Sequence, residues 1–164
     1  MEEVILSLGS NVGNRLSYLS HAVKQISNLS ASPLEISSIY ETEAWGALPL
    51  DPFLNLCLSL QTHLEPQPLI LLLQEIEKSL GRESKNSGLS RTIDIDILFF
   101  GNRVIQQENL AIPHPRLQLR NFVLFPLVEL RNNLWHPTLE KSILEIKNIC
   151  PDQLTIHKTS FQII

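Results

Sequence analysis

The sequence predicts an α+β fold: a ferredoxin-like βαββαβ core in which an antiparallel sheet has helices packed on it, followed by a C-terminal hairpin and helix. Three observations predict it, namely apolar runs bounded by turn residues, two segments with helical spacing, and a strict polar–apolar alternation over residues 92–97. In this topology the first and third strands are the central pair, and the fourth lies beside the first. We expect the helices on one face and the other face open.

The N-terminal segment predicts a strand, a turn and a helix, in that order. Residues 4–8 are a short apolar run that ends at Gly9, as expected for a buried strand. A turn-rich stretch follows over residues 9–15. The apolar residues after it recur at the spacing of one helical face: Leu16, Leu19, Val23 and Ile26.

Two further strands are predicted before the second helix. β-Branched and aromatic residues over 34–40 favour a strand, and glycine and prolines punctuate a loop over 42–52. From Phe53 onward leucine occupies every second position, so Phe53 and Asn55 share the face opposite the leucines. We therefore expect these two side chains to lie together on the open face.

The second helix is predicted to begin near Pro66 and to end at Gly81, because proline suits a first helical turn and glycine the position past the last. Its apolar stripe is Leu69, Leu72, Leu73, Ile76 and Leu80. Gln74 and Glu77 are three residues apart, so their side chains are neighbours on the flank of this helix. After the fourth strand, residues 101–105 are expected to turn and pair back as a hairpin.

Size, composition and charge limit the class of protein. The 164 residues correspond to a single domain over 1–164, with 43% hydrophobic and 18% charged residues. No apolar run is long enough to span a bilayer, and a net charge of -4 with a pI near 5.7 disfavours nucleic acid as a partner. The acidic start of the chain is unlike a secretion signal, and Cys57 and Cys150 have no metal-site spacing. We expect a cytoplasmic monomer with reduced cysteines and no membrane partner.

The fourth strand carries the clearest signal for chemistry. Isoleucine alternates with polar residues from Thr92 to Ile97, so Asp94 and Asp96 share one face. At a rise of about 3.3 Å per residue their Cα atoms stand roughly 6.6 Å apart, close enough for both carboxylates to reach the same divalent cations. A lone Asp-x-Asp also occurs on solvated strand faces. Arg91 lies just before this motif, and the isoleucines on the opposite face would anchor the strand in the core. Both features favour carboxylates that are held in place for metal-assisted phosphoryl chemistry.

Other residues suit a phosphate or a flat heterocycle, each with a simpler interpretation beside it. The turn after Gly9 can present backbone amides to an anion or merely cap a helix. Trp45 can stack on a ring or pack on the core, and Asn55 can bind the edge of a heterocycle or add strand polarity. His114, between two prolines, either binds phosphate or ends a turn. Basic residues that would neutralise a polyphosphate if they converge are Arg82, Lys85, Arg91, Arg116 and Arg120.

Several of these motifs occur in the order and spacing of one family. They are Gly9-Ser10-Asn11, Phe53-Leu54-Asn55, Glu77 with Gly81-Arg82, Arg91-Thr92-Ile93-Asp94-Ile95-Asp96-Ile97, Pro113-His114 and Arg120-Asn121-Phe122. Over nearly its whole length the chain resembles the 6-hydroxymethyl-7,8-dihydropterin pyrophosphokinases of folate biosynthesis. The resemblance implies transfer of the pyrophosphoryl group of ATP to the hydroxymethyl group of the pterin, which gives the pterin diphosphate and AMP.

The resemblance also implies roles for individual residues. Asp94 and Asp96 would hold two Mg²⁺ ions, with Arg82 and Arg91 as further catalytic residues. Contacts with the nucleotide are implied for Gln74, Glu77, Arg82, Arg91, Ile97, His114 and Arg120. Contacts with the pterin are implied for Thr42, Ala44, Trp45, Phe53, Asn55, Asp94 and Phe122. The reaction would work chiefly by positioning ATP and 6-hydroxymethyl-7,8-dihydropterin, with no dedicated protein base.

Two stretches depart from the family pattern. Many members have prolines after the equivalent of Thr42, where this chain has Glu43-Ala44-Trp45. Many have Trp-Gly-Pro before the equivalent of Arg91, where this chain has Gly88-Leu89-Ser90. Both stretches are predicted loops, so the nucleotide contacts of Arg82 depend on how the second loop is arranged.

Two other functions remain open on the sequence. One is a divalent-metal-dependent nucleotide-sugar transferase, for which Asp94-x-Asp96 would be the metal motif, although the chain is short for such an enzyme. The other is a catalytically silent ferredoxin-like module that binds a ligand or RNA. That module would tolerate the loss of both carboxylates, and the chain lacks the basic, aromatic-rich strand of an RNA-recognition sheet.

Overall fold

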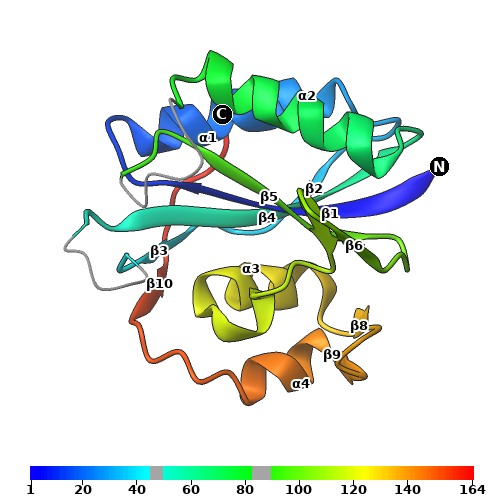
Figure 1. The fold of residues 1–164 in the computed structure, drawn as a ribbon. Helices are drawn as coiled ribbons and strands as arrows, with labels where there is room; N and C mark the ends of the chain where they lie inside the picture. The colour runs from blue at the N-terminus through cyan, green and yellow to red at the C-terminus, as the bar shows by residue number, and fades with distance from the viewer. Residues whose placement is uncertain (45–49, 83–89) are drawn as a thin grey trace.

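A six-stranded antiparallel sheet forms the middle layer of the fold, with strand order β10-β3-β4-β1-β5 and β2 also paired with β4 (Figure 1). The computed structural model describes residues 1–44, 50–82 and 90–164. The strands are β1 (Glu2–Ser10), β2 (Glu35–Ile36), β3 (Tyr40–Thr42), β4 (Phe53–Thr62), β5 (Asp94–Phe100) and β10 (Ile156–Lys158). β1 pairs with both β4 and β5, which confirms the predicted strand order and fold class.

Helices α1 (Arg15–Ser27) and α2 (Pro66–Ser79) cover one face of the sheet (Figure 1). Asn14 caps α1 by accepting a hydrogen bond from the Ser17 backbone at 3.1 Å. α2 begins at Pro66, and Gly81 just past its end has a φ of 86°, a left-handed value that glycine adopts without strain. The predicted start and end signals of α2 are therefore confirmed.

The main core lies between these two helices and the sheet. It contains the alternate leucines of β4 and the isoleucines before and within β5, all nearly fully buried: Leu54, Leu56, Leu58, Leu60, Ile93, Ile95 and Ile97. Because side chains alternate across a strand, this burial turns Phe53, Asn55, Asp94 and Asp96 to the opposite face. The alternation of side chains along β4 and β5 therefore places Asn55, Asp94 and Asp96 on the same face of the sheet.

That opposite face is only half open, so the expectation of helices on one face alone is wrong. Helices α3 (Asn121–Arg131) and α4 (Ile143–Asn148) lie beneath it (Figure 1), with a short 3₁₀ turn, η1 (Leu117–Leu119), before α3. The reason is a second apolar cluster on this face. Its members include Ile5, Cys57, Leu98, Phe99, Val123, Leu124, Leu127, Ile143 and Ile146. The polar alternation of β5 ends after Ile97, where the sequence becomes apolar, and the sheet register shifts at Leu98. Leu98 and Phe99 both belong to the second cluster and need this cover.

Two local expectations are also corrected. The strand predicted over 34–40 is interrupted between β2 and β3, because the hydroxyl of Ser37 accepts the Cys57 backbone N–H at 3.0 Å in place of a main-chain carbonyl. The hairpin predicted at 101–105 does not return to β5. Residues 105–107 pair instead with residues 110–112 in a separate small sheet.

The remaining strands form two small sheets outside the main one. One pairs β6 (Ile105–Gln107) with β7 (Leu110–Ile112), and the other pairs β8 (Trp135–His136) with β9 (Lys141–Ser142). The latter leads directly into α4, so the predicted C-terminal hairpin and helix are present. None of the helices in the described ranges has the length and apolar character that crossing a bilayer requires.

Glu129, near the end of α3, ties that helix to the edge of the sheet. Its carboxylate accepts hydrogen bonds from the backbone and hydroxyl of Ser38, both at 2.8 Å, from the hydroxyl of Tyr40 at 2.6 Å, and from Lys158 of β10 at 3.2 Å. Burial by itself would raise the pKa of Glu129, but these donors outweigh it and lower the pKa to about 2. The charged carboxylate therefore joins α3, β3 and β10.

We predict that Glu129→Gln lowers the stability of the fold by roughly 1–2 kcal/mol at pH 7, because a neutral amide is a weaker acceptor for these donors. The pKa of Glu129 is depressed in the folded state, so its contribution is present above about pH 4.5 and is lost as the pH falls toward 2. Thermal melts from pH 7 to pH 3 should show the gap between wild type and variant closing. A gap that stays constant with pH would contradict this role.

Candidate active site

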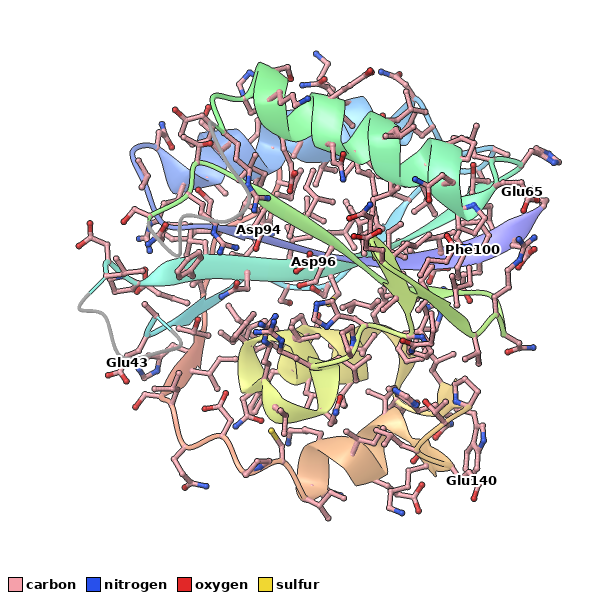
Figure 2. All side chains as sticks on the ribbon, viewed as in Figure 1. Glu43, Glu65, Asp94, Asp96, Phe100 and Glu140 are labelled. Atoms are coloured by element: carbon pink, nitrogen blue, oxygen red, sulfur yellow. The ribbon has the colours of Figure 1, made fainter. Side chains whose placement is uncertain are left out.

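One row of residues crosses the sheet and organises the polar face. Tyr40 of β3 is paired in register with Asn55 of β4, Asn55 with Gly9 of β1, and Gly9 with Asp94 of β5. Two residues further along, Asp96 is the partner of Ser7 on the same face. In Figure 2 Asp94 and Asp96 follow one another along β5, away from the end that carries Phe100.

A cavity of about 220 Å³ lies between this row and the start of α3. It is lined by Ser7, Gly9, Thr42, Glu43, Leu50, Phe53, Asn55, Arg91, Asp94, Asp96, Arg116, Arg120 and Phe122. One part of the lining is aromatic and amide, and the other holds the carboxylates of Asp94 and Asp96 together with three arginines. The cavity therefore combines a recess suited to a flat polar ring with a strongly charged mouth.

The amide part of the cavity is held rigidly. The side-chain nitrogen of Asn55 donates to the hydroxyl of Thr42 at 2.9 Å, and both residues are buried. Gly9 beside it leaves room for this arrangement, since a Cβ there would stand 2.9 Å from the Asn55 Oδ1 and 3.5 Å from the Phe53 ring. The missing side chain of Gly9 thus keeps the floor of the cavity flat between Asn55 and Asp94.

The charged part is organised around Asp94. One carboxylate oxygen accepts from Arg82 and the other from Arg91, each at 2.6 Å. Arg82 also pairs with Glu77, which is 2% exposed and accepts the backbone N–H of Ile95 at 2.8 Å. Among the described residues, two carboxylates and two guanidinium groups are therefore in direct contact, which offsets the cost of burying their charges. Glu77 reaches from α2 around the edge of the sheet to order this group.

His114 stands beside Asp96 on a turn that is fixed at both ends. Its backbone N–H donates to the carbonyl of Leu98 at 3.0 Å, and its Nδ1 accepts the N–H of Arg116 at 3.1 Å. Burial lowers the pKa of His114 to about 4, and the positive charges of Arg120 and Arg116 contribute in the same direction. The ring is therefore neutral near pH 7, with its proton on Nε2, which lies 3.9 Å from a carboxylate oxygen of Asp96.

The structure brings most of the predicted site residues together. Those that line the cavity are Thr42, Phe53, Asn55, Arg91, Asp94, Asp96, Arg120 and Phe122. Arg82, Glu77 and His114 join them through the contacts described above. Gln74 lies on α2 across the sheet, and the side chain of Ile97 faces the main core. Their nucleotide contacts, and that of Ala44 with the pterin, stay predictions, whereas Trp45 and Lys85 fall outside the described residues.

Three cavity residues were missed by the sequence analysis: Ser7, Glu43 and Leu50. Glu43 was noted there only as part of a stretch that departs from the family pattern. Ser7 is two positions before Gly9 on β1, so the period of a strand would have placed it on the same face. Leu50 belongs to a non-repetitive segment that carries no periodic signal.

The oxygen atoms that line the cavity fit a hard divalent cation whose remaining ligands are phosphate oxygens and water. Asp94 and Asp96 offer carboxylate oxygens on one face of β5, and Mg²⁺ is typically bound by one or two carboxylates together with substrate phosphates and water. Within residues 1–44, 50–82 and 90–164, no group of three or more His, Cys, Asp or Glu side chains could enclose a metal alone. The guanidinium groups of Arg82 and Arg91, which contact Asp94, can neutralise the negative charge of such a phosphate.

Comparison with protein families decides the assignment. The family model described as 7,8-dihydro-6-hydroxymethylpterin-pyrophosphokinase (HPPK) matches residues 5–132, which is most of the chain. The chain belongs to the HPPK family. The match runs from β1 to the turn after α3, so the small β8–β9 sheet, α4 and β10 lie beyond it.

Individual HPPK relatives agree with this assignment. The 2-amino-4-hydroxy-6-hydroxymethyldihydropteridine pyrophosphokinase of Aquifex aeolicus is 40% identical over 147 residues, covering 90% of this chain and 91% of the relative. The protein of the same name from Porphyromonas gingivalis is 42% identical over 131 residues, covering 77% and 89%. A crystal structure of HPPK-DHPS in complex with substrates has a TM-score of 0.73 at 18% identity. It covers 90% of this chain, which spans 44% of that protein, and the likeness to it concerns the fold.

We predict that Gly9→Ala destabilises the fold by roughly 1–3 kcal/mol, because its Cβ would crowd Asn55 and Phe53. In an Asn55→Ala background the crowding atom is gone, and the same change should become neutral or slightly stabilising, since alanine restricts the unfolded chain more than glycine does. Denaturant melts of the four proteins in this cycle measure the coupling. Additive effects would show that the space above Gly9 is not shared with Asn55.

We predict that the His114 ring stays neutral from pH 8 to pH 5 and gains a proton near pH 4. Because the pKa of an unfolded histidine is about 6.5, the folded state loses stability as the pH falls from 6.5 toward 4, by on the order of 3 kcal/mol in total. The ¹⁵N shifts of the ring measure both the protonation and the tautomer. Titration near pH 6.5, or a proton on Nδ1, would contradict the arrangement described.

Proposed function

We propose that this chain transfers the pyrophosphoryl group of ATP to the hydroxymethyl group of 6-hydroxymethyl-7,8-dihydropterin, which gives the pterin diphosphate and AMP in folate biosynthesis. The observation that carries the proposal is one cavity in which the paired carboxylates of Asp94 and Asp96 adjoin a recess formed by Phe53, Asn55 and Phe122. Membership of the HPPK family supports the same reaction. We propose that it acts as one domain over 1–164, as a cytoplasmic monomer without nucleic acid.

The aromatic recess is the pterin site in this proposal. Phe53 and Phe122 come from opposite sides of the cavity, β4 and α3, so a flat heterocycle can stack between them. Asn55 supplies an amide at the floor, already oriented by Thr42, to hydrogen-bond the polar edge of the ring. A pre-oriented amide discriminates strongly against a ring that lacks the matching edge. We assign further contacts with the pterin to Ala44 and Trp45.

The charged mouth is the triphosphate site. Arg91 and Arg120 line it, Arg82 reaches it through Asp94, and His114 offers a neutral Nε2–H donor beside Asp96. Guanidinium forks match phosphate oxygens, and a neutral imidazole donates without adding charge. We assign Gln74 and Glu77 of α2 and Ile97 of β5 to the nucleotide as well, since α2 contacts this edge strand through Glu77.

Asp94 and Asp96 would hold Mg²⁺, and we propose two ions. When bound, such ions neutralise the triphosphate and increase the acidity of the attacking hydroxyl group. Arg82 and Arg91 each donate a hydrogen bond to one oxygen of Asp94. If Asp94 bound a cation instead, these two guanidinium groups would be available to the phosphate oxygens of the nucleotide.

The protein accelerates the reaction chiefly by positioning. The hydroxymethyl oxygen bonds to the β phosphorus and loses its proton to water. The bond from this phosphorus to the oxygen shared with the α phosphorus breaks, and AMP leaves with that electron pair. Arg82 and Arg91, already held by Glu77 and Asp94, can stabilise the charge that moves between these oxygens. No side chain is assigned as a general base.

The direct test is the formation of AMP from ATP, with Mg²⁺, in the presence and absence of 6-hydroxymethyl-7,8-dihydropterin. We expect AMP only when the pterin is present. Release of AMP or ADP that is independent of the pterin would refute the proposal, and tighter binding of nucleotide-sugars than of ATP would favour the transferase alternative.

We predict that Asp96→Asn and Asp96→Ala lower kcat by at least about 1,000-fold, because either change removes an anionic ligand from the metal–triphosphate site. The melting temperature should change by only a few degrees, since the Asp96 side chain is 36% exposed. Glu108→Gln, an exposed carboxylate in the β6–β7 turn, is the charge-matched control and should have full activity. Retained turnover in both Asp96 variants would contradict a role for Asp96 in holding the metal.

A further inference from the structure

Asn11, the first residue after β1, connects two chain segments that lie on different sides of the active site. Its side-chain oxygen accepts the backbone N–H of Arg91 at 2.6 Å, and its own backbone N–H donates to the Arg91 carbonyl at 3.0 Å. Its side-chain nitrogen donates to the carbonyl of Asp51 at 3.2 Å and to the hydroxyl of Ser90 at 3.5 Å. The residue is 2% exposed.

Each of the two segments leads to one substrate site. Asp51 lies between Leu50 and Phe53, which line the aromatic recess of the cavity. Arg91 extends its side chain to Asp94 in the charged mouth, 2.6 Å from a carboxylate oxygen. A single buried amide therefore lies between the wall of the pterin site and the backbone of an arginine that we assign to the triphosphate.

The chemistry of an amide suits this position. Asparagine carries one acceptor oxygen and one nitrogen with two donor hydrogens, so Asn11 can bind Arg91 and Asp51 at the same time. A buried amide that loses one partner is left with an unsatisfied polar group, which costs more than the bond itself contributes. The positions of Asp51 and Arg91 are therefore linked through Asn11.

We propose that Asn11 is a positioning residue that couples the two substrate sites, so that binding of one substrate favours binding of the other. The inference rests on the proposed function, since it takes the recess for the pterin and the mouth for the triphosphate. When a triphosphate draws the Arg91 side chain away from Asp94, the backbone of Arg91 stays tied to Asn11, and Asn11 in turn holds Asp51. Ordering one wall thus reduces the entropy still to be lost at the other.

The coupling is measured as a ratio of dissociation constants. Calorimetry gives the Kd of 6-hydroxymethyl-7,8-dihydropterin alone and with a saturating non-hydrolysable ATP analogue and Mg²⁺. We expect tighter pterin binding with the nucleotide, and by linkage the same factor must appear when the order is reversed. A residue that only stabilises the fold would leave this ratio unchanged.

Two variants divide the contacts of Asn11. Asn11→Asp keeps an acceptor for the Arg91 N–H but loses the donor to Asp51, whereas Asn11→Ala loses both contacts. In both variants we expect the coupling ratio to fall about fivefold toward 1. This is the change in a dissociation constant that one net hydrogen bond produces. The matched control is Asn14→Ala in the same turn, which removes the cap of α1 but touches neither segment. It should lower the melting temperature and keep the wild-type ratio.

A measurement on the wild type keeps the test valid if the variants fold poorly. The amide of Arg91 donates to Asn11, so hydrogen exchange at this amide should slow when the pterin alone is bound. A wild-type ratio of 1, a ratio unaltered in both Asn11 variants, or unchanged exchange at Arg91 would overturn the inference while AMP formation still stands. Absence of pterin binding and of AMP in the wild type would instead refute the proposed function, and the inference with it.

Discussion

The antiparallel register of β1 between β4 and β5 is the constraint on which the site depends. It places Gly9 directly between Asn55 and Asp94, so that an amide and a carboxylate from strands far apart in the sequence share one cavity floor. A shift of one residue would turn both side chains into the leucine and isoleucine core. The same buried core that stabilises the fold therefore fixes the spacing between the pterin recess and the phosphate mouth.

Charge balance is the second element of the design. Asp94, Glu77, Arg82 and Arg91 form a continuous set of ion pairs. Glu77 comes from α2, Asp94 from the edge strand β5, and the two arginines from the segments beside these elements. The arginines are therefore already held at the mouth of the cavity, and binding of phosphate would require only an exchange of their partners. His114 contributes a donor without contributing charge, because burial and two arginines keep its ring neutral. Recognition of the triphosphate thus uses groups whose protonation is set in advance.

Sequence periodicity predicted the site residues that lie on strands but not the contacts made by residues outside them. The period of two predicted that Phe53 and Asn55 share a face, as do Asp94 and Asp96, and the order of elements predicted the sheet. The break after β2 could not be predicted, because a Ser37 hydroxyl replaces a backbone carbonyl there. Nor could the roles of Glu77 and Asn11, whose hydrogen bonds reach residues that are distant in the sequence. Contacts with ligands remain predictions for every site residue.

The contact between Glu77 and Ile95 has a consequence at the rim of the sheet. β5 is an outer strand, and unpaired main-chain donors on such a strand invite association with a strand of another molecule. The carboxylate of Glu77 occupies one of these donors and is itself buried against Arg82, so an intruding strand would have to expel a paired anion. At the other rim β10 presents only three residues. Both rims therefore resist intermolecular sheet growth, the first step of aggregation.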